Sequence, residues 1–148
     1  MMSNYINAEI RRIVATRANN VCEYCLIAEE DAYFRFQVEH IISRKHDGSS
    51  ELDNLALACV YCNRHKGSDI ASLKPNTDEL IRFYNPRKDK WREHFLLNET
   101  FIESLTEIGE ATTRILQMNN DEQMLERDIL IRQKRYLSDS AILLTTEH

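Results

Sequence analysis

The sequence of 148 residues predicts a small α+β domain built around a bound metal ion. Two Cys-x2-Cys pairs, Cys22/Cys25 and Cys59/Cys62, are separated by 33 residues, a spacing typical of a metal site. Between the pairs, alternating and β-branched residues indicate strands, and outside them apolar residues at three- and four-residue steps indicate helices. A chain of this length can bury a hydrophobic core of its own.

The four cysteines suit structural zinc. Four thiolates can surround one Zn²⁺ as a tetrahedron, with Zn–S distances of about 2.3 Å. The alternative is a set of unrelated buried cysteines, since Cys packs well in hydrophobic cores, but the paired spacing favours zinc. Because the protein would supply all four ligands, no position stays open for water. We therefore expect this ion to stabilise the fold and to take no part in chemistry.

The first half of the chain predicts one helix and two strands. Apolar residues recur every three or four positions over residues 7–18, which predicts an amphipathic helix. Residues 33–42 alternate apolar with polar side chains, which predicts a half-buried strand with His40 at its end. Residues 43–53 are almost devoid of apolar side chains and are expected to form an exposed loop. A second short strand is expected over residues 55–59.

Two more helices and a hairpin are expected downstream. A short helix is predicted over residues 62–72, ending before Pro75 because the residue that precedes a proline avoids the α region. A threonine followed by two acids resembles an N-cap and predicts a helix over residues 77–85. The apolar segments 95–97 and 101–105 are expected to pair as a β-hairpin.

The last third of the chain predicts a helical hairpin. Ser104 and Glu107 fit a capping box, and apolar residues with helical spacing follow them. A second helix is expected to carry Leu125, Ile129 and Tyr136.

The charge distribution divides the chain into two parts. The formal net charge of -5 is unfavourable for binding a polyanion, because Lys and Arg supply most of the non-specific affinity for phosphates. Residues 1–92 contain 14 Lys and Arg against 13 Asp and Glu, whereas residues 93–148 contain 5 against 11. We therefore expect a core over residues 1–92 and an acidic, mainly helical extension over residues 93–148 that packs on it.

The sequence gives no sign of a membrane or export segment. Residues 1–10 show no basic stretch followed by an apolar one, and no window approaches 18 uninterrupted apolar residues. We expect a soluble, cytoplasmic protein without membrane contact, and in a reducing compartment paired cysteines favour a metal over disulfides.

A second set of residues lies among the cysteines in a recognisable order. Glu39-His40-Ile41 comes first, Asn54-Leu55 follows, and residues 59–67 read Cys-x2-Cys-Asn-x2-Lys-Gly. Together with the first cysteine pair, this pattern resembles the HNH endonucleases, whose core is a ββα-metal (His-Me finger) motif with a zinc knuckle. The resemblance covers residues 22–67, and residues 83–95 look like a segment of a subgroup of small bacterial HNH proteins. It implies a ββα-metal core flanked by an N-terminal helix and the C-terminal helical hairpin.

The resemblance also implies a role for each residue of this set. His40 would be the general base that activates water, as an imidazole with a pKa near neutrality can be. Glu39 and Asn63 would bind one catalytic Mg²⁺ or Mn²⁺ through oxygen atoms. Asn54 would brace the loop and orient His40. Lys66 follows Asn63 by three residues, so on a helix the two are expected to share a face and reach one phosphate.

The positions of Glu39 and His40 predict a local feature of the backbone. Neighbouring residues of a straight strand point to opposite faces of the sheet. Both side chains can serve one site only if the strand bends or ends there, and we expect such a bend.

The resulting hypothesis is a zinc-stabilised, Mg²⁺- or Mn²⁺-dependent endonuclease that hydrolyses phosphodiester bonds of DNA, most simply double-stranded DNA. The alternative is a non-catalytic zinc module of the same fold that binds nucleic acid. The C-terminal helices offer a possible homodimer interface. Tyr24 or Tyr61 could pack on the nucleic-acid backbone or on bases, and several Lys and Arg could contact phosphates, although surface charges are usually only solvated.

Overall fold

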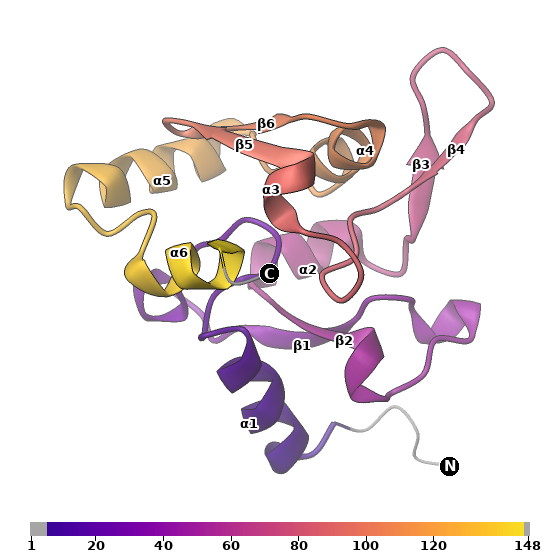
Figure 1. Cartoon of the computed structure of the whole chain (residues 1–148), viewed down its shortest axis with the longest axis horizontal. Helices are drawn as coiled ribbons and strands as arrows, with labels where there is room; N and C mark the ends of the chain where they lie inside the picture. The colour runs from indigo at the N-terminus through magenta and orange to yellow at the C-terminus, as the bar shows by residue number, and fades with distance from the viewer. Residues whose placement is uncertain (1–5, 147–148) are drawn as a thin grey trace.

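The computed structural model describes residues 6–146, which form helices and three small antiparallel sheets (Figure 1). In chain order the elements are α1 (Ala8–Arg17), η1 (Glu29–Asp31), β1 (Gln37–His40), η2 (Arg44–His46), η3 (Leu52–Asn54), β2 (Leu55–Ala58), α2 (Val60–Lys66), β3 (Ala71–Leu73), β4 (Leu80–Arg82), α3 (Trp91–His94), β5 (Phe95–Asn98), β6 (Phe101–Ser104), α4 (Glu107–Ile115), α5 (Asp121–Arg132) and α6 (Asp139–Thr146). The elements labelled η are short 3₁₀ turns. The α+β class predicted from the sequence is confirmed.

The segment that contains the cysteines folds as a ββα unit. β1 pairs antiparallel with β2, from Gln37 opposite Ala58 to His40 opposite Leu55. α1 and α2 both contact this pair of strands, and Figure 1 shows them on its two sides. All four residues of β2 are buried as a result. The helix, the loop and the second strand predicted for this half of the chain are confirmed.

β1 is shorter than the sequence pattern suggested. Residues 33–36 alternate like a strand, but they lie outside the sheet, and Tyr33 and Phe34 are exposed. The reason lies in the partner strand. β2 ends at Ala58, where the chain turns into α2, so residues before Gln37 have no backbone opposite them to pair with.

The helices predicted over residues 62–72 and 77–85 are corrected by the structure. α2 ends at Lys66, because Gly67 follows with a positive φ of 54° that few other residues adopt. Beyond it, β3 and β4 form a hairpin that projects from the body of the molecule (Figure 1). The hydroxyl of Thr77 donates to the Lys74 carbonyl at 2.8 Å and accepts from the Glu79 N–H at 3.1 Å. The threonine therefore closes a turn at the tip of the hairpin and does not cap a helix.

The C-terminal part contains the predicted hairpin and more helix than expected. β5 and β6 pair as predicted, from Phe95 opposite Ser104 to Asn98 opposite Phe101. The N-cap of α4 is Thr106, two residues after the predicted N-cap Ser104, and its side chain accepts the Gly109 N–H. Three helices follow the hairpin where two were predicted, because Tyr136 lies beyond α5 and α6 comes after it.

The extension packs on the cysteine-containing unit. The Tyr136 hydroxyl donates to the Cys25 carbonyl at 2.8 Å, and the Tyr84 N–H donates to the Thr112 hydroxyl at 2.8 Å. Buried apolar residues from both parts form one core. The division at residue 92 stays a prediction. Within the described residues, no helix has the length and apolar character needed to cross a membrane.

Candidate active site and metal centre

The four cysteines converge on one buried point. Their sulfur atoms all lie within 4.8 Å of one another, and the Cys25 and Cys59 sulfurs are 3.8 Å apart. In a tetrahedron with Zn–S distances of about 2.3 Å, the sulfurs are separated by about 3.8 Å. The residues present therefore fit a zinc ion, and the four-cysteine cluster is suited to bind one.

The backbone prepares these sulfurs to act as ligands. The Cys62 N–H donates to the Cys59 sulfur at 3.3 Å, and the Cys25 N–H donates to the Cys22 sulfur at 3.5 Å. Burial acts to raise the pKa of Cys22, but hydrogen bonds from the other three thiols lower it well below its usual value. Contacts among the same thiols raise the pKa of Cys59 and Cys62. Zinc coordinates the thiolate form, so binding of the ion would displace the remaining thiol protons.

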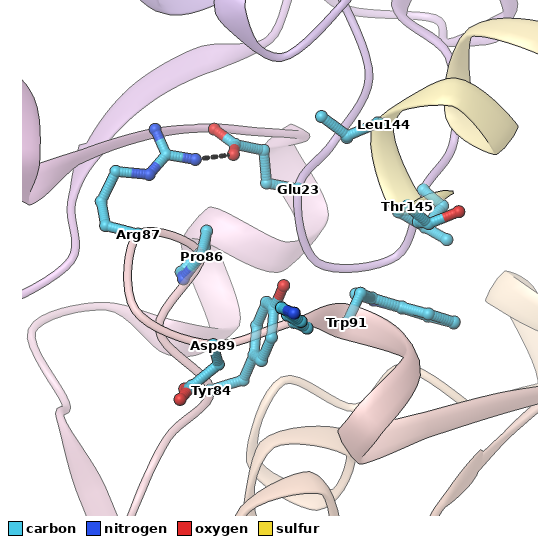
Figure 2. A pocket seen from close by; sticks show the side chains of 10 residues that line it. Glu23, Tyr84, Pro86, Arg87, Asp89, Trp91, Leu144 and Thr145 are labelled. Atoms are coloured by element: carbon cyan, nitrogen blue, oxygen red, sulfur yellow. Dashed lines mark hydrogen bonds and ion pairs between the residues drawn. The ribbon is translucent and has the colours of Figure 1, made fainter. Parts of the chain in front are cut away.

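The first cysteine pair is fixed in place by residues far along the chain. Figure 2 shows Arg87 reaching Glu23, one of the two residues between Cys22 and Cys25, and forming an ion pair with it. The other carboxylate oxygen of Glu23 accepts the Leu57 N–H at 2.8 Å. The Trp91 indole N–H donates to the Tyr24 carbonyl at 2.8 Å. The segment around residues 86–91 thus ties the first pair to β2, which is a structural role.

An open cleft lies beside the cluster, on the other side of α2. Glu39, His40 and Asn63 line it together, with Arg44 and Lys45 at its edge. β1 ends at His40, and the Ile41 N–H then donates to the Asn54 carbonyl outside the sheet. The strand therefore ends as expected for one site, but no bend separates Glu39 from His40, because both are paired with β2.

His40 is half-buried and held by a serine. Its Nε2 lies 2.9 Å from the Ser50 hydroxyl. Burial lowers the pKa of His40 below its usual value, and the nearby charges of Arg44 and Lys66 lower it further. The imidazole is therefore mainly neutral at neutral pH and able to accept a proton.

Asn54 holds the loop that follows His40. Its carbonyl oxygen accepts the Ile42 N–H at 2.9 Å, and its amide donates to the carbonyls of Ile42 and Ser49 at 2.9 and 2.7 Å. A Cβ at Gly48 would lie 1.7 Å from the Ile42 carbonyl oxygen, so only glycine fits there. This loop carries Ser50, whose hydroxyl lies 2.9 Å from His40 Nε2.

Glu39 and Lys66 form a buried ion pair at the floor of the cleft. The Lys66 ammonium lies 3.1 Å from a Glu39 carboxylate oxygen, and the Tyr24 hydroxyl bonds the other oxygen. Lys66 also donates to the carbonyls of Ile41 at 2.9 Å and His40 at 3.3 Å. Burial raises the pKa of Glu39, and the Lys66 charge opposes that rise.

The expected reach of Lys66 to a phosphate is corrected by this arrangement. Lys66 is only 1% exposed, and its ammonium points inward to a carboxylate and two carbonyls. Three residues along a helix amount to about 300°, so Lys66 is turned about 60° from Asn63. At the edge of a buried face this offset is enough to place one residue in the cleft and the other in the core. Tyr24 is likewise fully buried and cannot contact bases.

Comparison with known families agrees with the geometry. Residues 22–69 match the HNH endonuclease family model. The four cysteines of this segment fit the zinc-knuckle variant of the family. Comparison with curated proteins and with solved structures gave no significant match. The HNH match, together with the cysteine cluster, indicates a nuclease or nucleic-acid-binding function with a zinc site.

The HNH segment also contains partners that sequence reasoning missed. Asn63, which lines the cleft, donates its amide to the side chain of Gln37 at the start of β1. Ser50 contacts His40, and Tyr24 contacts Glu39. Ser50 sits in a run of small polar residues that resembles any exposed loop, so its sequence gave no signal. Tyr24 lies between two zinc ligands, a position that could have drawn attention.

Proposed function

We propose that this chain is a metal-dependent endonuclease that hydrolyses phosphodiester bonds of DNA. The observation that carries the proposal is the cleft of the HNH segment, which is lined by a neutral histidine, His40, together with Glu39 and Asn63. This set of groups is what metal-assisted phosphodiester hydrolysis requires, namely a base for water and hard oxygen ligands.

His40 is the general base in this proposal. Its lowered pKa keeps the ring ready to accept a proton from water at neutral pH. The Ser50 hydroxyl engages Nε2, which fixes the ring and assigns the base role to Nδ1. Asn54 acts as a positioning residue, because it holds the loop that carries Ser50.

Glu39 and Asn63 are the proposed ligands of a catalytic Mg²⁺ or Mn²⁺. Both line the cleft beside His40, and both offer the hard oxygen atoms that these ions prefer. The ion would stabilise negative charge on the phosphate and on the leaving oxygen. Lys66 and the Tyr24 hydroxyl hold the Glu39 carboxylate in a defined orientation. Arg44 and Lys45 at the edge of the cleft are proposed to attract the DNA backbone.

One observation favours the alternative of a non-catalytic binding module. Both carboxylate oxygens of Glu39 already have a partner, one in Lys66 and one in Tyr24. A carboxylate used only to neutralise a buried lysine would leave the cleft able to bind phosphate but unable to hold a metal ion. Cleavage separates the two functions, because only the first requires His40.

The test is cleavage of supercoiled plasmid DNA by the purified zinc-loaded protein. We expect nicked or linear products with Mg²⁺ or Mn²⁺, and none after brief addition of EDTA. The His40→Ala variant is expected to lose activity by about 10²- to 10⁴-fold, the usual contribution of a general base. His46→Ala is the matched control, since His46 is exposed in the same loop and outside the cleft.

The outcomes separate the two functions clearly. Equal cleavage by wild type and His40→Ala would rule out the proposed mechanism. DNA binding without any cleavage under these conditions would favour the non-catalytic module.

A dimer through the C-terminal helices also remains a proposal, supported by the exposed Leu125 and Ile129 one turn apart on α5. Sedimentation analysis of Leu125→Lys tests it, with a monomeric wild type as the contrary result.

A further inference from the structure

A second hollow lies next to the cleft and is lined by aromatic side chains. Tyr33, Phe34 and Phe36, from the segment before β1, form one side. Tyr61 and Arg64, from α2, form the other. We call this hollow the aromatic groove. Gln123 and Glu126 of α5 close one end with polar groups.

Two of these aromatic side chains are unusually exposed. Tyr33 is 93% exposed and Phe34 is 64% exposed, and their rings meet edge to face with centroids 5.1 Å apart. They contribute little to the core, although the segment around them is well anchored. The Phe36 N–H donates to the Glu29 carboxylate at 2.8 Å, and Arg11 donates to the Phe36 carbonyl. The backbone therefore presents two aromatic faces to solvent from a fixed base.

The groove and the cleft share both of their supporting elements. Viewed along the axis of α2, Val60 and Arg64 lie on one side of the helix, one turn apart. Asn63 and the C-cap residue Gly67 lie on the neighbouring side, also one turn apart. The first pair lines the groove and the second pair lines the cleft. The segment that leads from Phe36 into β1 also runs from the groove to the cleft. A strand of nucleic acid in the cleft would therefore place a neighbouring nucleotide at the groove.

One cation and one anion line the groove, Arg64 and Glu126, so its preference for a polyanion depends on the cations next to it. The Arg64 guanidinium lies 5.9 Å from the centre of the Tyr61 ring, and Arg35 follows the two exposed aromatics. Arg44 and Lys45 line the adjoining cleft. Aromatic faces beside a cationic track are the usual means of binding unpaired nucleotides, because every base offers a π-face. The amide of Gln123 and the carboxylate of Glu126 can hydrogen-bond a base edge.

We propose that the aromatic groove binds an unpaired base next to the scissile phosphate, so that the substrate is a nucleic acid with single-stranded character at the cut. This inference rests on the proposed function, since it places the scissile phosphate in the cleft. Bases inside an intact duplex are stacked on each other and cannot enter the groove. The preferred substrates are therefore single strands, flaps or locally unpaired duplexes.

The test measures binding separately from cleavage. The His40→Ala chain, loaded with zinc and kept without added Mg²⁺, is titrated into a fluorescein-labelled single-stranded oligonucleotide and into its matched duplex, and anisotropy is recorded. Tyr33→Ala and Phe34→Ala are each expected to weaken single-strand binding by about 5- to 50-fold, the usual effect of removing one stacking side chain. Duplex binding should change by less than about twofold.

Four further variants show whether a loss is due to stacking. Phe101→Ala removes another exposed aromatic, on β6 and outside the groove, and is expected to bind like the parent. Phe34→Tyr keeps a ring and should retain binding. Arg64→Gln is expected to weaken binding of both oligonucleotides. Arg132→Gln makes the same charge change on α5, away from the groove, and should have little effect.

The outcomes are distinguishable from those of the cleavage experiment. If Tyr33→Ala and Phe34→Ala bind single strands as tightly as Phe101→Ala, the groove has another occupant, such as a protein segment, and the inference is wrong. If they weaken single-strand and duplex binding equally, stacking on an unpaired base is excluded. If they weaken single-strand binding while the wild-type chain cuts no DNA, the groove binds unpaired bases as proposed and the proposed endonuclease activity is wrong.

Discussion

Two buried carboxylates, Glu23 and Glu39, border very different hollows although their immediate surroundings look alike. Each is 4% exposed, and each pairs with a cation, Glu23 with Arg87 and Glu39 with Lys66. Glu23 borders a cavity of about 30 Å³, room for little more than a water molecule (Figure 2). Glu39 lies at the floor of a cleft of about 340 Å³. The two sites therefore differ in the space that a ligand could occupy beside the carboxylate.

The ion pair alone does not distinguish the two carboxylates; their other neighbours do. Glu23 joins the first cysteine pair to β2 and to the segment that carries Arg87, so its partners are structural on every side. Glu39 has the same kind of partners but also borders the groups proposed to act on DNA. Burial and pairing alone would have classed both as structural.

Loss of a zinc ligand is expected to abolish the fold. Cys62→Ala should bind no zinc and should lose its cooperative thermal transition, since structural zinc contributes about 10 kcal/mol or more to folding of small metal-bound domains. Zinc analysis and circular dichroism measure both. Tyr61→Phe, at the neighbouring position, is the control and should keep about one zinc per chain. A cooperative transition at the wild-type temperature in Cys62→Ala would show that the cluster is not the anchor of the fold.

Glu39→Gln is expected to lose plasmid cleavage by about 100-fold or more, because the proposed metal ion loses its charged ligand. The substitution also leaves Lys66 buried without its counterion, which destabilises the chain by about 3–5 kcal/mol. The double variant Glu39→Gln/Lys66→Met removes both charges and should recover most of that stability. Denaturant unfolding and cleavage are measured on both variants.

Activity and stability should separate in this pair of variants. The double variant is expected to be stable and inactive. If cleavage returns together with stability, Glu39 serves only to neutralise Lys66, and the proposed metal site is wrong.

Glu23→Gln makes the same change as Glu39→Gln at the other buried carboxylate. It is expected to lower stability without changing cleavage. It breaks the pair with Arg87 and should lower the free energy of unfolding by about 3 kcal/mol, since the partly buried guanidinium loses its counterion. The amide oxygen can still accept the Leu57 N–H. Cleavage per folded molecule, measured at low temperature, should stay within about twofold of wild type. A loss as large as that of Glu39→Gln would place Glu23 in the reaction.

The sequence predicted the scaffold better than the interior of the site. Cysteine spacing predicted the cluster, since four sulfurs in two short pairs have few other arrangements. The end of β1 at His40 and the pairing of β5 with β6 were also predicted. The inward turn of Lys66 was not, because residue spacing gives the shared face of a helix only to within about one neighbouring position.

Local signals misled where a distant partner decided the structure. Thr77 carries an N-cap signal, but pairing of β4 with β3 makes it a turn residue. Tyr33 and Phe34 continue the alternation of β1, but β2 is too short to pair with them. In both places tertiary context overrode local preference. The exposed aromatics that resulted are the basis of the proposed groove.

Asp89 is expected to have the smallest effect, and it tests whether the segment that pairs with Glu23 is held in place by an ionised carboxylate. The segment around residues 86–91 carries Arg87, the partner of Glu23, and Asp89 holds this segment in place. Its carboxylate accepts two hydrogen bonds from Arg82, at 2.8 and 3.0 Å, and the Asn85 N–H at 2.8 Å. His94 lies 3.9 Å away. Burial acts to raise the pKa of Asp89, but the hydrogen bonds and charges of these groups lower it below its usual value of 3.8.

The contribution of Asp89 to the free energy of unfolding therefore decreases as the pH falls. A carboxyl whose pKa is lower in the folded chain stabilises it above the unfolded value and loses that contribution as the pH falls. Asp89→Asn should cost about 1–2 kcal/mol at pH 7, and the difference from wild type should shrink below about pH 4. Urea unfolding across this range measures it, with Asp128→Asn, in a more exposed ion pair, as the control. A difference from wild type that stays constant down to pH 2 would mean that the ionised Asp89 does not hold the segment, which would leave Arg87 and Trp91 as its anchors.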